Sequence, residues 1–234
     1  MTMVPVACAT YIKSTAPALW YRFNELTGLT AINSGSLGAT YNGTYILGAG
    51  ALAQVGKLGG ADAVLFDKLD TRLAIPAGAY ANYPAMTIAV LSKNTSGGEG
   101  NLGTFWYWSA TGTARLTAAD ASQIVMRRAA ATYAETVVSA GLNMTGWQWK
   151  FYTYDHAGDL KIDIFKSSGG AAVECTYSTQ TAAVGALTDL SATALYIGNN
   201  DAQGRTLDGW LDEFALWNRV LTQAEMNKIV SLTP

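Results

Sequence analysis

The feature that most constrains the fold is an alternating stretch near the end of the chain, residues 210–218. Side chains along a β-strand point alternately to its two faces. The alternation predicts that Asp212 shares a face with Phe214. Glu213 then shares the opposite face with Trp217. The stretch therefore predicts a β-strand on which two adjacent carboxylates point in opposite directions.

A short helix is predicted directly after this strand. Thr222 is followed three residues later by Glu225, which is the spacing of a capping box at a helix N-terminus. Leu221, before the cap, is placed to contact Met226 as a hydrophobic staple. The predicted apolar face of the helix consists of Met226, Ile229 and Val230.

Earlier segments also predict strands, because they alternate or form short apolar runs between turns rich in glycine, asparagine and aspartate. These segments are residues 19–23, 64–66, 71–75, 86–91, 104–108, 146–154, 160–165 and 173–177. Repeated short strands with one terminal helix are typical of a two-sheet antiparallel sandwich. The length of 234 residues fits a single domain of this kind.

The closing segment resembles that of laminin-G-like, concanavalin A-type jelly rolls. These domains end in a Gly-apolar-Asp-Glu strand, an Asn-Arg pair, a Leu-Thr or Leu-Ser turn and a short helix. The matching residues are Gly209, Leu211, Asp212, Glu213, Asn218, Arg219, Leu221 and Glu225, with further agreement at residues 19–25, 56–67 and 195–199. The resemblance covers residues 18–233. It implies an all-β jelly-roll domain over residues 18–234, after an N-terminal arm of residues 1–17.

Residues 118–138 give conflicting signals. The alanine-rich composition around residues 123–128 favours helix by intrinsic propensity. The resemblance implies strands in the same place, where propensity alone is a weak guide. We follow the resemblance and predict strands.

The N-terminal arm carries one charged residue, Lys13, and two prolines. We expect such an arm to be loose unless a neighbouring subunit binds it. Its start has no basic residue ahead of the short apolar stretch 4–9, so it is not expected to be a secretory signal. Cys8 and Cys175 are too few for a disulfide framework. We expect two free thiols, with a single bridge as the alternative.

The charge pattern argues against two kinds of partner. Charged residues make up 14% of the chain and the net charge is −2, so no basic face suited to nucleic acid is expected. The only adjacent basic pair is Arg127 and Arg128. No apolar run approaches the roughly 20 residues needed to cross a bilayer, so no membrane insertion is expected either.

Catalysis is the first candidate activity, because the resembled family includes glycoside hydrolases. These enzymes need two carboxylates roughly 5–10 Å apart. The chain has no Glu-x-Asp-x-Glu run, and Asp163 shares its predicted face with no second acid. The lone histidine, His156, falls in a predicted hairpin turn and is expected to be solvated. We therefore expect no enzyme, and a glycoside hydrolase is the disfavoured alternative.

A structural calcium ion is the second candidate, since the resembled family often carries one between an N-terminal loop and a late strand. Asp212 supplies a carboxylate that is costly to bury alone, and calcium prefers oxygen ligands. Asn33 stands where the family commonly has aspartate, which removes one charge. The alternative is that Asp212 bonds to backbone amides or to Arg219.

A carbohydrate platform is the third candidate, because exposed aromatic rings stack on the apolar faces of sugars. The candidate rings and polar partners are Trp106, Trp108, Tyr152, Tyr154, Trp217, Asn199 and Asp201. The alternative is that the rings belong to the core and that the Asn-Asn-Asp run around residue 200 is ordinary turn chemistry.

We therefore expect a binding protein, in one of two settings that the resemblance equally implies. One is an assembly such as a bacteriophage virion, as a capsid decoration or tail-fibre protein that contacts a protein partner or further copies of itself. The other is a glycan-binding module on an extracellular surface. The apolar arm, the low charge, the missing signal and the end of the chain directly after the domain favour the assembly.

Overall fold

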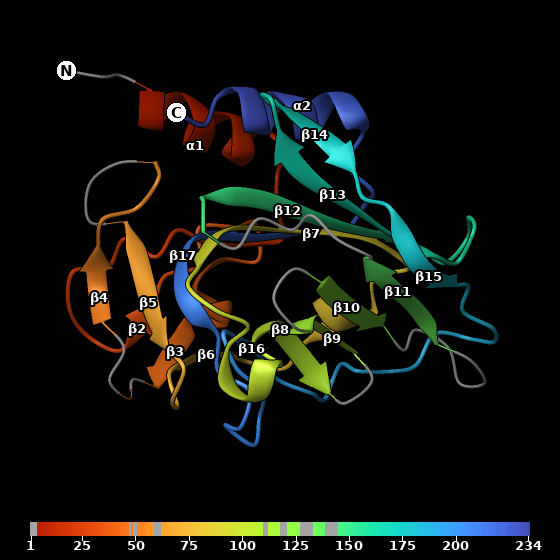
Figure 1. Cartoon of the computed structure of the whole chain (residues 1–234), viewed down its shortest axis with the longest axis horizontal. Coiled ribbons are helices and arrows are strands. Elements are labelled where there is room, and N and C mark those ends of the chain that lie inside the picture. The colour runs from red at the N-terminus through yellow and green to blue at the C-terminus, as the bar shows by residue number, and fades with distance from the viewer. Residues whose placement is uncertain are drawn as a thin grey trace.

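The computed structural model describes residues 4–46, 48, 51–58, 62–109, 112–117, 121–126, 133–138 and 145–234. Two antiparallel β-sheets lie face to face, and two helices cover the outer side of one of them (Figure 1). The predicted all-β jelly-roll sandwich with a short C-terminal helix is confirmed. No described helix is long and apolar enough to span a membrane.

The sheet beneath the helices, called sheet A, has the strand order β14-β13-β12-β7-β17-β5-β4, and β1 also pairs with β17. Its strands are β1 (Leu19–Tyr21), β4 (Ala51–Gln54), β5 (Ala63–Asp67), β7 (Ala85–Asn94), β12 (Gln148–Asp155), β13 (Ile162–Ser168), β14 (Ala171–Glu174) and β17 (Asp208–Trp217). The alternating stretch of residues 210–218 therefore lies in the central strand β17, as predicted.

The opposite sheet, called sheet B, has the order β15-β11-β10-β9-β8-β16-β6-β3-β2. Its strands are β2 (Thr30–Ala31), β3 (Gly43–Ile46), β6 (Arg72–Ile75), β8 (Thr104–Ser109), β9 (Gly112–Thr117), β10 (Ala121–Met126), β11 (Ala134–Val138), β15 (Tyr177–Thr181) and β16 (Leu195–Ile197). The strand prediction for residues 118–138 is confirmed over β10 and β11. Arg127 and Arg128 lie outside the described residues.

Two hydrophobic cores lie on the two faces of sheet A. The larger fills the space between the sheets and contains Phe66, Trp106 and Phe214. The smaller lies between sheet A and the helices and contains Trp149 and Trp217. Sheet A is therefore apolar on both faces, which is why its central strands read as apolar on both sides in the sequence.

The N-terminal arm differs from its prediction. Residues Val4–Ser14 form helix α1, in which Cys8 and Ile12 are completely buried against sheet A and helix α2. Figure 1 shows the two helices side by side over this sheet. The expectation of a loose arm is wrong, because the chain's own second core covers the apolar side of the helix. Cys8 and Cys175 are both free, as predicted.

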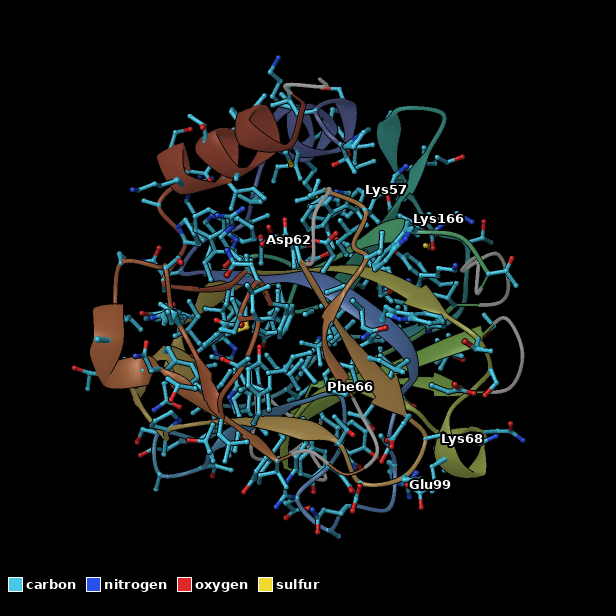
Figure 2. The ribbon with its side chains drawn as sticks, turned by 90° about the vertical axis from the view of Figure 1, so that its left-hand side faces the viewer. Lys57, Asp62, Phe66, Lys68, Glu99 and Lys166 are labelled. Carbon is cyan, nitrogen blue, oxygen red and sulfur yellow. The ribbon has the colours of Figure 1, made fainter. Side chains whose placement is uncertain are left out.

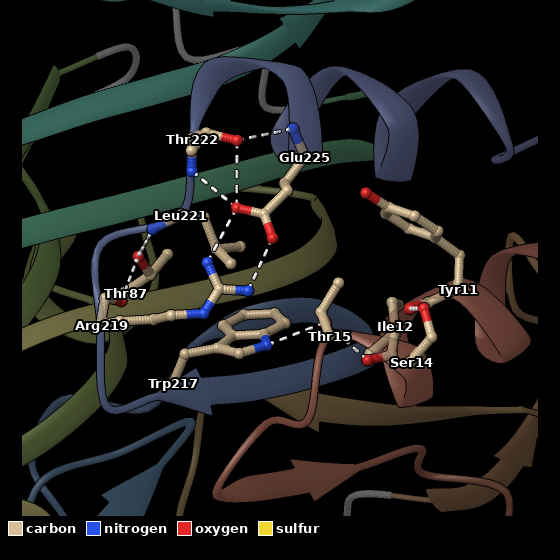
Figure 3. A network of polar contacts seen from close by, with 10 residues as sticks. All are labelled: Tyr11, Ile12, Ser14, Thr15, Thr87, Trp217, Arg219, Leu221, Thr222 and Glu225. Atoms are coloured by element: carbon tan, nitrogen blue, oxygen red, sulfur yellow. Dashed lines mark hydrogen bonds and ion pairs between the residues drawn. The ribbon is translucent and has the colours of Figure 1, made fainter.

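Helix α2 (Gln223–Ser231) confirms the predicted capping box. The Thr222 hydroxyl accepts the backbone N–H of Glu225, and the Glu225 carboxylate accepts the backbone N–H of Thr222 at 2.9 Å. The same carboxylate holds both guanidinium nitrogens of Arg219, at 2.6 and 2.8 Å (Figure 3). Met226, Ile229 and Val230 are buried as predicted.

Candidate functional site

The aromatic side chains selected from the sequence are all buried. Their exposed fraction is 1% or less for Trp106, Trp108, Tyr152, Tyr154 and Trp217. The first four pack between the sheets, while Trp217 lies beneath α1 and donates from Nε1 to Thr15 Oγ1 at 3.0 Å (Figure 3). The expectation that these rings are exposed is therefore wrong, because the second sheet or the N-terminal helix covers each of them.

The two polar residues selected from the sequence have different surroundings. Asn199 is completely buried, and its Oδ1 accepts the backbone N–H groups of Asn200 and Arg205 at 2.8 and 3.0 Å. It therefore organises the loop between β16 and β17 and presents no free group to solvent. Asp201 lies in the same loop and is exposed, as a ligand contact requires.

An exposed aromatic pair lies next to this loop, on the outer face of sheet B. Tyr107 of β8 and Tyr196 of β16 are cross-strand partners, and their ring centroids are 6.5 Å apart. Both are half-buried. Leu195 and Ile197, on either side of Tyr196, are buried between the sheets, so Tyr196 and its cross-strand partner Tyr107 point away from the core.

Charged groups surround this tyrosine pair. The guanidinium carbon of Arg72, on the neighbouring strand β6, lies 4.9 Å from the ring centroid of Tyr196. Arg72 Nη1 donates to the backbone carbonyls of Asn200 and Asp201 at 3.1 and 2.6 Å, so it joins the sheet to the loop. We call Tyr107, Tyr196, Arg72, Asp201 and Arg205 the tyrosine platform.

The electrostatics of Tyr107 confirm that the loop reaches the platform. Partial burial raises the pKa of Tyr107, and the neighbouring Asp201 carboxylate raises it further, whereas Arg205 acts in the opposite direction. The phenol is therefore a neutral hydrogen-bond donor at physiological pH. Only Asp201 of this platform was selected from the sequence. The missed signal is that Tyr107 and Tyr196 each alternate with buried apolar neighbours.

A second group of ionisable residues lies on the opposite side of the molecule, beneath the helices. Strand β17 has a β-bulge at Asp212, whose flanking residues pair with the adjacent residues Ser92 and Leu91 of β7. The extra residue interrupts the alternation. Asp212 and Glu213 therefore both contact the core beneath the helices, through Leu58 and Trp20 respectively. The prediction that they point to opposite faces is wrong.

Both carboxylates of this bulge have few counter-charges. Asp212 Oδ2 accepts the backbone N–H groups of Lys57 and Leu58, the second at 2.8 Å. Glu213 accepts Trp20 Nε1 at 2.5 Å and lies 3.7 Å from Arg22. Burial raises the pKa of Asp212 to about 7, against the lowering effect of its backbone donors. Burial, and then the Asp212 charge, raise the pKa of Glu213 well above its usual value.

The residues selected for calcium have protein partners in this structure. Asn33 Oδ1 already accepts the backbone N–H groups of Trp20 and Gly35, at 2.8 and 3.0 Å, and so closes a turn. Asp212 Oδ2 accepts two backbone N–H groups, whereas its buried Oδ1 has no hydrogen-bond partner among the described residues. Within the described ranges, no group of three or more acidic, cysteine or histidine residues is suited to a metal. The backbone-amide alternative for Asp212 is confirmed, whereas Arg219 pairs with Glu225.

The geometry gives no support for hydrolysis. Asp212 and Glu213 are 0% and 1% exposed, so a glycosidic bond has no access to them. His156 is half-buried in the turn after β12, and its Nδ1 contacts the Tyr154 hydroxyl at 2.8 Å. No other described residue links it to a nucleophile.

Comparison with solved structures supports the fold. The receptor-binding domain of botulinum neurotoxin type G is similar with a TM-score of 0.62 and 11% identity, over 92% of this chain and 51% of that chain. Domain 4 of AbnA, a GH43 extracellular arabinanase from Geobacillus stearothermophilus determined with arabinotriose, has a TM-score of 0.59 and 13% identity, over 93% of this chain and 98% of that chain. This chain spans about half the length of the neurotoxin domain. At these identities the likeness shows the fold alone.

Sequence comparison identifies the family. No curated protein matches the chain in sequence. A family model, however, matches residues 67–227, which is more than half of the chain. That range runs from the end of β5 through the closing strand β17 and into helix α2. The chain belongs to the concanavalin A-like lectin/glucanases superfamily.

Proposed function

We propose that this protein is a non-catalytic binding protein that recognises glycans through the tyrosine platform. The observation that carries the proposal is the pair of half-buried rings, Tyr107 and Tyr196, fixed on adjacent strands with Arg72 against one of them. Rings held by a sheet lose little conformational freedom on binding, and their apolar faces suit the C–H face of a sugar ring.

The groups around the rings suit sugar hydroxyls. Asp201 is an acceptor at the exposed end of the platform, and Arg205 is a half-buried donor beside it. Arg72 is engaged with the carbonyls of the loop, so the loop is held in place before a ligand arrives. A surface prepared in this way binds at a lower entropic cost.

The positions of these carboxylates support the non-catalytic part of the proposal. The adjacent acids Asp212 and Glu213 are covered by the helix layer, and the platform itself holds a single carboxylate, Asp201. Retaining and inverting hydrolysis both require a pair of accessible carboxyl groups. The proposed role is therefore recognition alone, at an extracellular or virion surface.

A glycan array followed by titration tests this proposal. The wild-type chain is expected to bind a subset of glycans, and the double variant Tyr107→Ala/Tyr196→Ala to lose roughly tenfold or more in affinity, since stacking is worth about 1–3 kcal/mol per ring. Tyr11→Ala is the matched control, because Tyr11 is a half-buried tyrosine on α1, at the opposite side of the sandwich. Equal binding by wild type and double variant would refute the platform.

A second candidate function is a structural role in an assembly, such as a bacteriophage capsid decoration or tail-fibre protein. It is favoured by exposed apolar residues on both sides of the edge strand β2: Leu26 and Leu29 before it are 66% and 57% exposed, and Ile32 after it is 56% exposed. Exposed apolar groups of this kind suit a protein interface. Light scattering at rising protein concentration tests this role. Oligomers that dissociate in the Leu26→Ser/Leu29→Ser variant would support it. A wild-type chain that stays monomeric at every concentration would rule out self-association.

A further inference from the structure

A pocket of about 290 Å³ opens on the helix-covered side of sheet A. It lies where the C-terminal end of α2, the turn between β13 and β14, and the segment between β4 and β5 meet. Its lining includes Trp147, Lys57, Ser167, Ser168 and Val230. None of these residues belongs to the tyrosine platform on sheet B, so the pocket is a separate feature of the surface.

The wall formed by Trp149 is fixed on two sides. Its indole Nε1 donates to Thr233 Oγ1 at 2.7 Å, and its backbone N–H donates to Ser167 Oγ at 3.0 Å. The side chain is 1% exposed and stacks on Phe151 with ring centroids 5.7 Å apart. Ser167 accepts in this arrangement, so its hydroxyl hydrogen is left for another acceptor.

The opposite wall is held by the buried carboxylate of the β17 bulge. Asp212 Oδ2 accepts the backbone N–H groups of Lys57 and Leu58, and both Asp212 and Leu58 are buried. The backbone of Lys57 is therefore fixed, while its half-buried side chain lines the pocket. Asp212 thus acts as a positioning residue for a lysine at the surface.

The side chains that line the pocket carry a single charge. Lys57 is its only charged side chain, and no ion pair involves Lys57 in the part of the chain that the structure describes. The other polar side chains of the lining are hydroxyls and indoles. Trp149 Nε1 and the Thr233 hydroxyl already donate within the protein, so the donors left for a ligand are Ser167, Ser168 and Trp147. An ammonium group with neighbouring hydroxyl donors favours a carboxylate, because charge-assisted hydrogen bonds are about twice as strong as neutral ones.

We propose that this pocket binds an acidic sugar residue, with its carboxylate on Lys57 and its ring against Trp147. The volume suits one small ring rather than a chain of several, since pockets for larger ligands run from about 300 to 1,000 Å³. Trp147 is half-buried and supplies an aromatic surface, while Leu91 and Val230 add apolar lining. The site shares no residue with the tyrosine platform. Failure of the platform proposal would therefore leave this inference standing, and the reverse also holds.

Titration with sodium glucuronate, sodium N-acetylneuraminate and neutral glucose tests the inference, by saturation-transfer NMR on the full chain. At least one acidic probe is expected to bind saturably, and glucose roughly tenfold or more weakly, because it lacks the carboxylate. Lys57→Gln is expected to abolish this preference and Trp147→Ala to weaken all binding. Lys68→Gln is the matched control, since Lys57 precedes strand β5 and Lys68 directly follows it, and Figure 2 shows the two lysines well apart.

A further variant separates loss of charge from loss of position. A Cβ on Gly56 would lie 2.6 Å from Asp212 Oδ2, so Gly56→Ala disturbs the carboxylate that holds Lys57 while keeping the lysine. It is expected to reduce the acid preference, with unchanged circular dichroism. Tyr107→Ala/Tyr196→Ala is expected to leave it intact. Equal binding of glucose and both acids, an unaffected Lys57→Gln variant, or no binding of either acid at millimolar concentration would overturn the inference.

Discussion

The outer faces of the two sheets carry aromatic rings in different situations. On sheet A, Trp149, Phe151 and Trp217 are at most 1% exposed because α1 and α2 cover them. On sheet B, Tyr107 and Tyr196 are half-buried and no described element covers them. The helix layer, more than the type of aromatic residue, therefore decides which of these rings a ligand can reach.

The largest expected effect is on stability, at the covered face. Trp217→Ala leaves a cavity under α1 and removes the indole bond to Thr15, so the free energy of unfolding is expected to fall by about 3–5 kcal/mol. Tyr196→Ala, on the uncovered face, is expected to cost less than about 1.5 kcal/mol. Urea unfolding of both variants measures the difference. Equal losses would remove the distinction between the two faces.

The next effect is a pH dependence that belongs to the covered face. The pKa of Asp212 is raised to about 7 from an ordinary value near 3.8, so the folded protein binds more protons than the unfolded chain between these values. Its contribution to stability is complete below about pH 4 and is lost as the pH rises through 7. Asp212→Asn, which keeps an acceptor oxygen, removes this loss.

Unfolding at a series of pH values measures that effect. The stability of Asp212→Asn relative to wild type is expected to rise by roughly 2–4 kcal/mol between pH 4 and pH 8, at about 1.4 kcal/mol per pKa unit. Glu213 also has a raised pKa and contributes in the same direction. Asp201→Asn, at the uncovered face, is the control and is expected to leave the profile unchanged. A difference that shrinks as the pH rises would contradict the assignment.

A smaller effect is expected at the helix that closes the covered face. Thr222→Ala removes the capping hydroxyl of α2 and is expected to cost about 1 kcal/mol. Thr222→Ser keeps the hydroxyl and is expected to restore most of this loss. Thermal unfolding of the three proteins measures it, and identical melting temperatures would show that the cap contributes nothing.

The smallest effect concerns calcium. Because Asn33 Oδ1 and Asp212 Oδ2 each accept two backbone N–H groups, we expect a chelator to leave the melting temperature within error of the untreated value. Isothermal titration with calcium chloride is the companion measurement. A melting temperature that falls on addition of chelator would indicate that calcium binds at the loop between β1 and β3.

The sequence predicted what depends on local pattern. The alternation of residues 210–218 specified β17, and the spacing of Thr222 and Glu225 specified the start of α2. It did not predict the bulge at Asp212, because the extra residue is defined only by pairing with β7. One inserted residue therefore reversed the expected direction of a carboxylate.

The candidate site was harder to predict for the same reason. Tryptophan and tyrosine look alike in a sequence whether they are buried or exposed, and Trp217 is covered by a helix some 200 residues away in the chain. Helix α1 itself was missed because its apolar residues gain stability only from tertiary contact with sheet A. The sequence did not separate Asp201, which is exposed, from Asn199 in the same loop, which is buried because its side chain accepts backbone N–H groups of the loop.

Hydrogen exchange with and without the best-binding neutral glycan from an array is the most direct test of recognition at the tyrosine platform, because a neutral glycan is not expected to favour the Lys57 pocket. We expect slower exchange in β6, β8, β16 and the loop around Asp201, with helices α1 and α2 unchanged. Protection of the helix-covered side alone, or of neither face at saturating glycan, would contradict recognition at the tyrosine platform.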